Sequence, residues 1–210
     1  MIKVLVVDDH AVVRRGLVQI LAEPPDMTAA GEASSGHEAL RAVEKDDFDV
    51  VVLDISLPDI NGLEVLKQLR SLKPELQVLV LSIHPEKQYA LRALKAGAAG
   101  YLTKESAPEE LVAAIRRVSQ GRKYLTPTLA ERLADQLGPG VKKEPHETLS
   151  DREYQVMSRL AAGKTVTEIA AELSLSVSTV STYRARILQK LGLKSTAEIM
   201  RYALERGLVE

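Results

Sequence analysis

Several apolar runs of this chain end in polar residues that could act together on a phosphate group. These residues are Asp8, Asp9, Asp54, Ser82 and Lys104. Carboxylates a few ångströms apart repel each other by a few kcal/mol at an effective dielectric constant of about 20, and a divalent cation such as Mg²⁺ removes that cost. With an ammonium group and a hydroxyl added, such a site could hold a phosphoryl group while an oxygen attacks it. Asp54 lies at the end of the central strand, so one of its carboxylate oxygens is the obvious attacking atom, and the residue would become an aspartyl phosphate.

The elements that would bring these residues together are five apolar strands that alternate with five helices. Strands are expected at 2–7, 27–33, 50–53, 77–82 and 100–103, and helices at 11–21, 36–42, 62–72, 85–96 and 106–120. This alternation predicts an α/β fold, a doubly wound five-stranded parallel sheet. Such sheets place their ligands at the carboxyl ends of the strands, which is where the polar residues stand.

Tyr101, three residues before Lys104, and the loop Leu-Pro-Asp-Ile-Asn-Gly at 57–62 complete a set of motifs. With these motifs, residues 2–120 resemble the flavodoxin-like receiver domain of bacterial two-component response regulators. The resemblance implies that Asp54 accepts phosphate from a phosphohistidine of a sensor histidine kinase in a Mg²⁺-dependent reaction. It also implies that Asp9, Asp54 and the backbone carbonyl of Ile55 bind Mg²⁺ directly, whereas Asp8 acts mainly through water.

The same resemblance implies roles for the remaining polar residues. Lys104 would pair with the phosphate, and Ser82 and Tyr101 would form a switch pair in which Tyr101 turns inward when Ser82 reaches for the phosphate. Ser56 and His84 occupy the two positions that tune phosphate lifetime in this family. His84 could equally be a solvated loop histidine, and any of these residues taken alone could be an ordinary surface or core residue.

The chain divides into three predicted parts. We expect a phosphoacceptor domain at 1–122, a linker at 123–147 with a possible helix at 127–137, and a second domain at 148–210. The stretch 138–145 is rich in Gly and Pro, has no apolar period and is typical of a flexible linker.

The second domain has the charge and helix pattern of a DNA-binding module. Residues 148–210 carry nine Lys or Arg and seven Asp or Glu, and residues 173–197 include four basic residues and no acidic one. A short helix, a turn at 174–175 and a basic helix at 177–191 predict a helix-turn-helix, although a basic helix can also be a solvated face. Val180, Tyr183 and Ile187 share the face expected in the core, so the opposite face is available to the major groove.

The motifs of residues 149–193 resemble the LuxR-type four-helix DNA-binding domain, so the whole chain resembles a NarL/FixJ-type response regulator. The candidate DNA contacts are Ser178, Ser181, Thr182, Arg184, Ala185, Arg186, Gln189, Lys190 and Lys194. The family often has lysines where this chain has Ser178 and Ser181, which suggests a different operator preference. Arg184 lies nearer the core side and would have to reach around to a phosphate.

In this family the last helix, which we predict at 196–205 in this chain, often pairs two DNA-binding domains on a two-fold site. Its apolar positions Ile199, Met200 and Ala203 suit that pairing and equally suit packing inside one domain. We expect a homodimer on a two-fold operator when the protein is phosphorylated.

Composition excludes several other classes of protein. The chain has no cysteine, so disulfides, cysteine–zinc sites and thiol nucleophiles are excluded. No apolar stretch approaches the ~18 residues of a membrane span, and the first strand begins at Ile2, so we expect a cytoplasmic protein without a signal peptide or membrane partner.

The resulting prediction is a transcription regulator that is switched by phosphorylation. It would catalyse only its own phosphorylation and dephosphorylation and would not be an enzyme in any other sense. Two alternatives stay open. One is a haloacid-dehalogenase-type phosphohydrolase, which would want a second acid at position 56, where this chain has Ser56. The other is a regulator that acts through protein contacts and whose helix-turn-helix no longer binds DNA, an idea supported only by the serines at 178 and 181.

Overall fold

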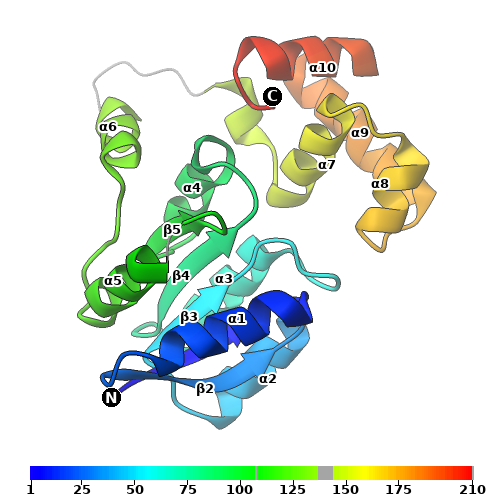
Figure 1. Cartoon of the computed structure of the whole chain (residues 1–210). Coiled ribbons are helices and arrows are strands. Elements are labelled where there is room, and N and C mark those ends of the chain that lie inside the picture. The colour runs from blue at the N-terminus through cyan, green and yellow to red at the C-terminus, as the bar shows by residue number, and fades with distance from the viewer. Residues whose placement is uncertain (107, 137–143, 210) are drawn as a thin grey trace. The chain divides into compact units, whose positions relative to one another are not determined.

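The computed structural model describes residues 1–106, 108–136 and 144–209. The chain forms two compact units, Met1–Asp135 and Gln136–Glu210 (Figure 1). Among the described residues, no helix combines the length and the apolar character that crossing a membrane requires.

The first unit is a five-stranded parallel sheet in the order β2-β1-β3-β4-β5. The strands are β1 (Ile2–Val7), β2 (Met27–Ala33), β3 (Val50–Leu53), β4 (Gln77–Ser82) and β5 (Gly100–Thr103). The helices are α1 (Ala11–Ala22), α2 (Gly36–Lys45), α3 (Gly62–Leu72), α4 (Glu86–Lys95), α5 (Pro108–Ser119) and α6 (Pro127–Gln136). The predicted α/β fold class is therefore confirmed.

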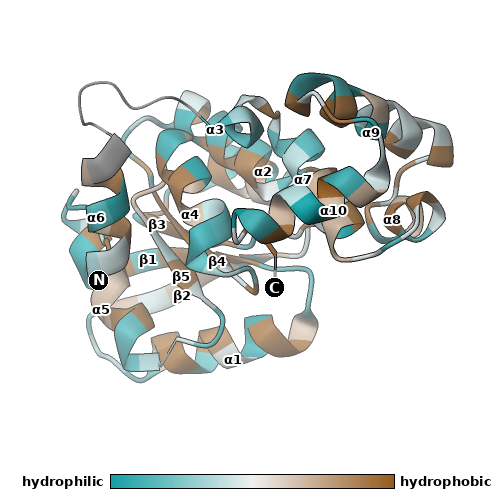
Figure 2. Ribbon diagram, turned by 90° about the horizontal axis from the view of Figure 1, so that it is seen from above, coloured by the Kyte–Doolittle hydropathy of each residue, from teal (hydrophilic) through white to brown (hydrophobic). Residues whose placement is uncertain are grey.

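Helices cover both faces of the sheet. Figures 1 and 2 show α1 and α5 on one face and α2, α3 and α4 on the other. Side chains alternate between the faces of a strand, so Val4, Val6 and Leu79 share one core with Leu17 of α1 and Ile115 of α5. Because both faces are covered, the strands read as continuous apolar runs.

The predicted helices differ from the observed ones by one or two residues at several ends, and two differences are larger. Helix α2 runs to Lys45, beyond the expected end at residue 42, because Val43 is fully buried and extends the apolar face. The first unit also continues past residue 122, where we predicted a linker: the N–H of Tyr124 bonds to the carbonyl of Ala99, and Leu129 of α6 is fully buried. The flexible stretch predicted at 138–145 lies mostly outside the described residues.

The second unit is helical. It contains a short 3₁₀ helix (Pro145–Thr148), α7 (Asp151–Ala161), α8 (Val166–Glu172), α9 (Val177–Leu191) and α10 (Thr196–Glu205). Capping boxes begin α7 at Ser150 and α8 at Thr165, and Ser174, in the turn between α8 and α9, has a φ of 52°. These local signals give the helix-turn-helix arrangement that the sequence predicts.

Asp59 anchors the loop between β3 and α3 to the start of α2. Its carboxylate accepts hydrogen bonds from the N–H groups of Gly36 and His37, both at 2.9 Å, and lies 2.6 Å from the His37 ring nitrogen. Partial burial alone would raise the pKa of Asp59, but the N–H groups of His37, Gly36 and Ile60 outweigh it and hold this pKa well below its usual range. The ionised carboxylate therefore stabilises the loop next to Asp54.

We expect Asp59→Ala to lower the free energy of unfolding by about 1–2 kcal/mol at pH 7 in urea denaturation, because two helix N–H groups lose their acceptor. Since the folded-state pKa is depressed, this contribution is complete above the unfolded pKa of about 4 and is lost as pH falls below it. The exposed Asp47, which pairs with Lys73, supplies the control Asp47→Ala. Equal losses in the two variants, or a loss as large at pH 3 as at pH 7, would contradict the role of Asp59.

Candidate functional site

A buried cluster of charged side chains at the carboxyl edge of the sheet, called the acidic pocket, consists of Asp8, Asp54 and Lys104. Val7 pairs with Leu53 in the sheet register, so the carboxylates that follow them stand side by side, and Lys104 comes directly after β5. The Lys104 ammonium lies 2.5 Å from Asp8 Oδ2 and 2.6 Å from Asp54 Oδ2. Both carboxylates are almost fully buried, and the Ser56 N–H donates to Asp54 Oδ1 at 3.0 Å.

Burial and charge oppose each other in this pocket. Burial raises the pKa of Asp54 above its usual value, although Lys104 and the Ser56 N–H act against the shift. Burial alone would lower the pKa of Lys104, but the charge of Asp54 and hydrogen bonds to Asp54 and Asp8 outweigh it and raise this pKa. The pocket therefore favours additional positive charge beside its carboxylates.

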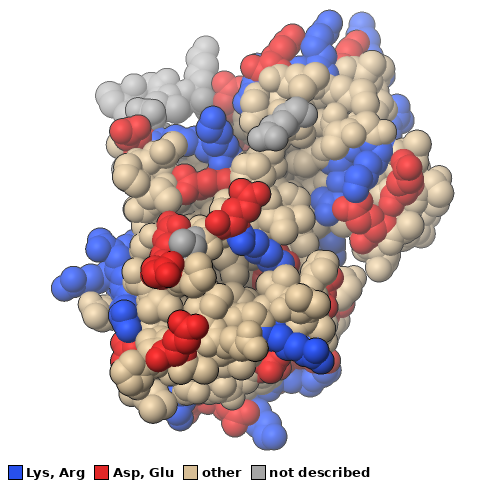
Figure 3. Space-filling view, in the orientation of Figure 1, with Lys and Arg blue, Asp and Glu red and all other residues tan. Residues whose placement is uncertain are grey.

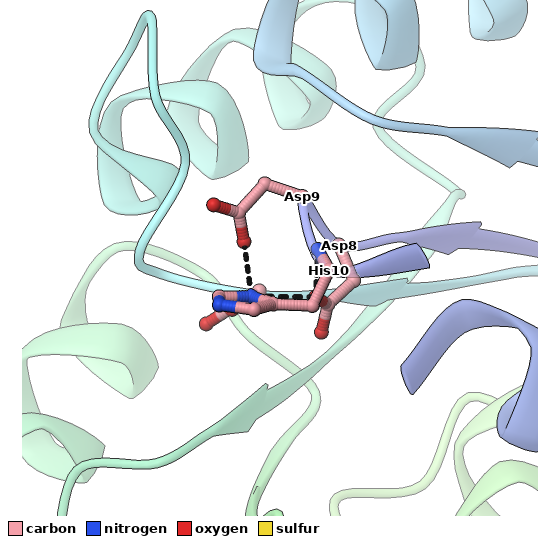
Figure 4. A group of neighbouring side chains, drawn as sticks. Asp8, Asp9 and His10 are labelled. Carbon is pink, nitrogen blue, oxygen red and sulfur yellow. Dashed lines mark hydrogen bonds and ion pairs between the residues drawn. The ribbon is translucent and has the colours of Figure 1, made fainter. Parts of the chain in front are cut away.

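Asp9 and His10 extend the acidic group toward solvent. The carboxylates of Asp8, Asp9 and Asp54 and a ring nitrogen of His10 offer ligand atoms that all lie within 4.8 Å of one another. Figure 4 shows the His10 ring turned toward both neighbouring carboxylates. His10 was not among the predicted site residues, and its position directly after the two aspartates was the only signal.

The loop after Asp54 packs tightly on the pocket. The Ile55 carbonyl accepts a hydrogen bond from the N–H of Gly62 at 3.0 Å and keeps a second lone pair for another partner. A Cβ at position 62 would lie 2.3 Å from the Asp54 carbonyl oxygen, so only glycine fits there. Asn61 begins α3 by accepting the N–H of Leu63 at 2.8 Å.

Ser82, His84, Tyr101 and Ser56 form one hydrogen-bonded group beside Asp54. The N–H of His84 donates to Ser82 Oγ at 3.2 Å, and the Tyr101 hydroxyl donates to the His84 carbonyl at 2.7 Å. The Ser56 hydroxyl lies 3.3 Å from His84 Nε2, and the His84 ring stacks on Tyr89 at 4.6 Å. Tyr101 is buried, which raises its pKa. The residues predicted as switch pair and lifetime positions therefore contact one another.

Most of the predicted DNA-binding residues form an exposed face on α9. Ser178, Ser181, Thr182, Ala185, Arg186, Gln189 and Lys190 are exposed, as is Lys194 just beyond the helix. Val180 and Ile187 on the opposite face are fully buried. Figure 3 shows acidic and basic side chains interspersed on the visible face of the first unit, so surface charge alone would not locate a binding site there.

Two of the predicted DNA contacts have partners inside the second unit. Arg184 is half-buried, and its Nε donates to Thr196 Oγ1 at 2.7 Å. The Lys190 ammonium lies 2.6 Å from Glu153 Oε2. Partial burial would raise the pKa of Glu153, but Lys190 and the N–H of Ser150 lower it overall. Arg184 and Lys190 therefore each have a structural role in addition to the predicted DNA contact. The side chain of Arg186, in contrast, makes no hydrogen bond or ion pair with the part of the chain that the structure describes.

The apolar positions of α10 are used mainly inside their own unit. Ile199 and Ala203 are fully buried and Met200 is half-buried, in a helix that packs against α7. The exposed large apolar residue of this helix is Leu204, at 56% exposure. The structure therefore supports packing within one domain for Ile199 and Ala203.

The sequence matches two family models. Residues 4–116 match the response regulator receiver domain, and residues 147–203 match the bacterial regulatory proteins of the luxR family. The chain is 38% identical to the response regulator UvrY of Escherichia coli (strain K12) over 209 residues, which covers 99% of this chain and 96% of the relative. It is 39% identical to the response regulator GacA of Pseudomonas aeruginosa over 211 residues, covering 100% and 99%.

A solved structure with a similar fold is RcsB from Salmonella enterica serovar Typhimurium, bound to promoter rprA in the presence of the phosphomimetic BeF₃⁻. Its TM-score is 0.66 at 25% sequence identity, and the match covers 96% of this chain and 98% of that one.

Proposed function

This chain belongs to the DNA-binding response regulators of the NarL/FixJ type, a receiver domain followed by a LuxR-type DNA-binding domain, and we propose that Asp54 is its phosphoacceptor. The observation that carries the proposal is the meeting of Asp8, Asp54 and Lys104 in one buried pocket. The family consists of transcription regulators rather than enzymes that turn over a substrate, which leaves the phosphohydrolase alternative without support.

The donor set of the pocket fits Mg²⁺, which prefers oxygen ligands. Asp8, Asp9, Asp54 and the Ile55 carbonyl would hold the ion, and the ion would neutralise charge that builds up on the transferred phosphoryl group. Lys104 has its ammonium beside Asp54, where it can pair with the incoming phosphate. In the transfer, the bond from phosphorus to a kinase histidine nitrogen breaks as a bond from phosphorus to an Asp54 oxygen forms.

The switch would act through the start of α4. Ser82 and Tyr101 both bond to the backbone of His84, which precedes Glu86, the first residue of α4, by two positions. If Ser82 turns toward the phosphate on Asp54, it gives up the His84 N–H, and the first turn of α4 loses one of its supports. Ser56 and the His84 ring would set how readily water reaches the phosphate.

Helix α6 is tied to that same turn of α4. The Thr126 hydroxyl lies 2.8 Å from both carboxylate oxygens of Glu86, and Arg132 donates to the carbonyl of Lys87 at 3.0 Å. A change at His84 therefore has a contiguous route to α6, which precedes the second unit in the chain. A few kcal/mol of differential contact is enough to move such a two-state balance.

In the second unit, the exposed face of α9 would enter the major groove and Arg186 and Lys194 would contact phosphates. Phosphate contacts give affinity and salt dependence, while the shorter side chains, such as Ser178 and Thr182, would read base edges. We place two such domains on a two-fold operator, with phosphorylation promoting the homodimer.

Asp54→Asn is expected to abolish phosphate incorporation from a small acyl phosphate or a phosphorylated sensor kinase, because the attacking oxygen is lost. Intact-protein mass spectrometry would detect one phosphoryl group on the wild-type chain in Mg²⁺ and none after chelation. Asp47→Asn, at an exposed carboxylate, should label normally. Undiminished labelling of the Asp54 variant would refute the assignment.

Thr126→Ala should weaken the attachment of α6 to α4 and raise amide hydrogen exchange in residues 127–136 of the unphosphorylated chain, because the hydroxyl that bonds Glu86 and accepts the Leu129 N–H is gone. Thr126→Ser keeps the hydroxyl and serves as the matched control. Phosphorylation should raise exchange in the same helix of the wild-type chain. If phosphorylation leaves exchange in α6 unchanged, the proposed route through α4 is wrong.

Arg186→Ala should weaken binding to duplex DNA and reduce the slope of log K against log salt by about 0.9, the loss of one phosphate contact. Fluorescence anisotropy over a series of salt concentrations would measure both quantities. Lys45→Ala, an exposed charge on α2 of the receiver, is the control for net charge. An unchanged slope in the Arg186 variant would place the DNA-binding face elsewhere.

A further inference from the structure

The ring of His10 is positioned as a nitrogen ligand beside the three carboxylates of the pocket. Its Nδ1 lies 2.6 Å from Asp9 Oδ1 and 3.4 Å from Asp8 Oδ1 (Figure 4). The backbone N–H of His10 donates a hydrogen bond to Asp8 Oδ1 at 2.8 Å. We propose that His10 is an additional ligand through which the pocket binds borderline divalent cations such as Mn²⁺, Co²⁺ and Zn²⁺. This inference rests on the metal site proposed above.

The spacing of the donor atoms suits a single ion. Opposite ligands of an octahedral ion with bonds of about 2.1 Å lie about 4.2 Å apart. The four donors from Asp8, Asp9, His10 and Asp54 fall within 4.8 Å of one another, so small side-chain rotations bring them around one centre. His10 is 65% exposed, and its ring is free to make such a rotation.

Lys104 and His10 contact different oxygens of Asp8. Lys104 pairs with Oδ2, and His10 contacts Oδ1 by both its backbone N–H and its ring. The His10 ring can therefore exchange its carboxylate partner for a metal ion while Lys104 stays in place for the phosphate. Asp9 Oδ1, the nearest partner of the ring, would then become a ligand of the same ion.

The chemistry of imidazole decides which ions gain from His10. Mg²⁺ prefers oxygen ligands and retains its waters, so a nearby imidazole adds little to its binding. Mn²⁺, Co²⁺ and Zn²⁺ rise in affinity for mixed nitrogen and oxygen sites, and imidazole is a common ligand for the later ions of the series. His10 should therefore shift the selectivity of the pocket toward these ions without creating a separate site.

A second histidine of the same domain provides the comparison for an ordinary pair. His37 lies 2.6 Å from Asp59 by the same ring nitrogen and is 63% exposed, almost as His10 is. The difference is that His10 faces a group of three carboxylates, whereas no such acidic group around His37 occurs among the described residues. If the His10 contact were only an exposed acid–histidine pair, the two histidines would behave alike.

The test is metal binding to the full-length chain, measured by isothermal titration calorimetry with Mg²⁺, Mn²⁺ and Zn²⁺ added separately. For His10→Ala we expect Zn²⁺ affinity to fall at least about tenfold and Mg²⁺ affinity to change less than about twofold. His37→Ala should leave both affinities at the wild-type values. A fall in Zn²⁺ affinity of the same size in both variants, or in neither, would overturn the inference.

Pulsed electron paramagnetic resonance of bound Mn²⁺ gives a readout that depends on ligation alone. A coordinated imidazole nitrogen modulates the spin echo of Mn²⁺. If this nitrogen modulation is present in the wild type and the His37 variant and is lost in His10→Ala, His10 is the ligand. Mn²⁺ that binds without nitrogen modulation would refute the role of His10 and leave the oxygen site intact. Failure of Mg²⁺ and Mn²⁺ to bind at all would refute the metal site of the proposed function as well.

Discussion

The ammonium group of Lys104, held between the carboxylates of Asp8 and Asp54, is the interaction on which the rest of the receiver depends. Two carboxylates at 1% and 2% exposure would repel each other strongly without a cation between them. Removing one partner from a buried ion pair costs about 3–5 kcal/mol, because the other charge is left uncompensated. Lys104 therefore offsets part of the repulsion between the two carboxylates, and their remaining oxygens are left for a metal ion and a phosphoryl group.

The sheet makes this arrangement possible because its strands are parallel and in register. Val7 pairs with Leu53 and Leu53 with Val80, so each polar residue that follows a strand arrives at the same edge. Gly62 lets the next loop pack directly on the backbone of Asp54, and Asp59 ties that loop to α2. The hydrogen bonds among Ser82, His84 and Tyr101 then connect the pocket to α4 and, through Glu86 and Thr126, to α6.

The sequence allowed prediction of features that depend on local pattern. The five strands follow from short apolar runs, and their common edge follows from parallel topology, so the meeting of Asp8, Asp54 and Lys104 was predictable. The docking of α6 was not, because it depends on Tyr124 and Leu129 finding partners far away in the chain. Helical spacing identified the exposed face of α9 but not the pairing of Lys190 with Glu153. Periodicity indicates on which side of a helix a side chain lies, but it does not identify the residue that the side chain contacts. The catalytic and DNA-binding roles of individual residues stay predictions.

The most direct test of the account is a crystal structure of the full chain with Mg²⁺ and the phosphoryl mimic beryllofluoride. We expect beryllium bound to a carboxylate oxygen of Asp54, the magnesium ion held by Asp9, Asp54 and the Ile55 carbonyl with Asp8 acting through water, and the Lys104 ammonium moved from Asp54 to a fluorine. Beryllofluoride on another side chain, or Lys104 still bridging Asp8 and Asp54 with no ion beside them, would contradict the central claim.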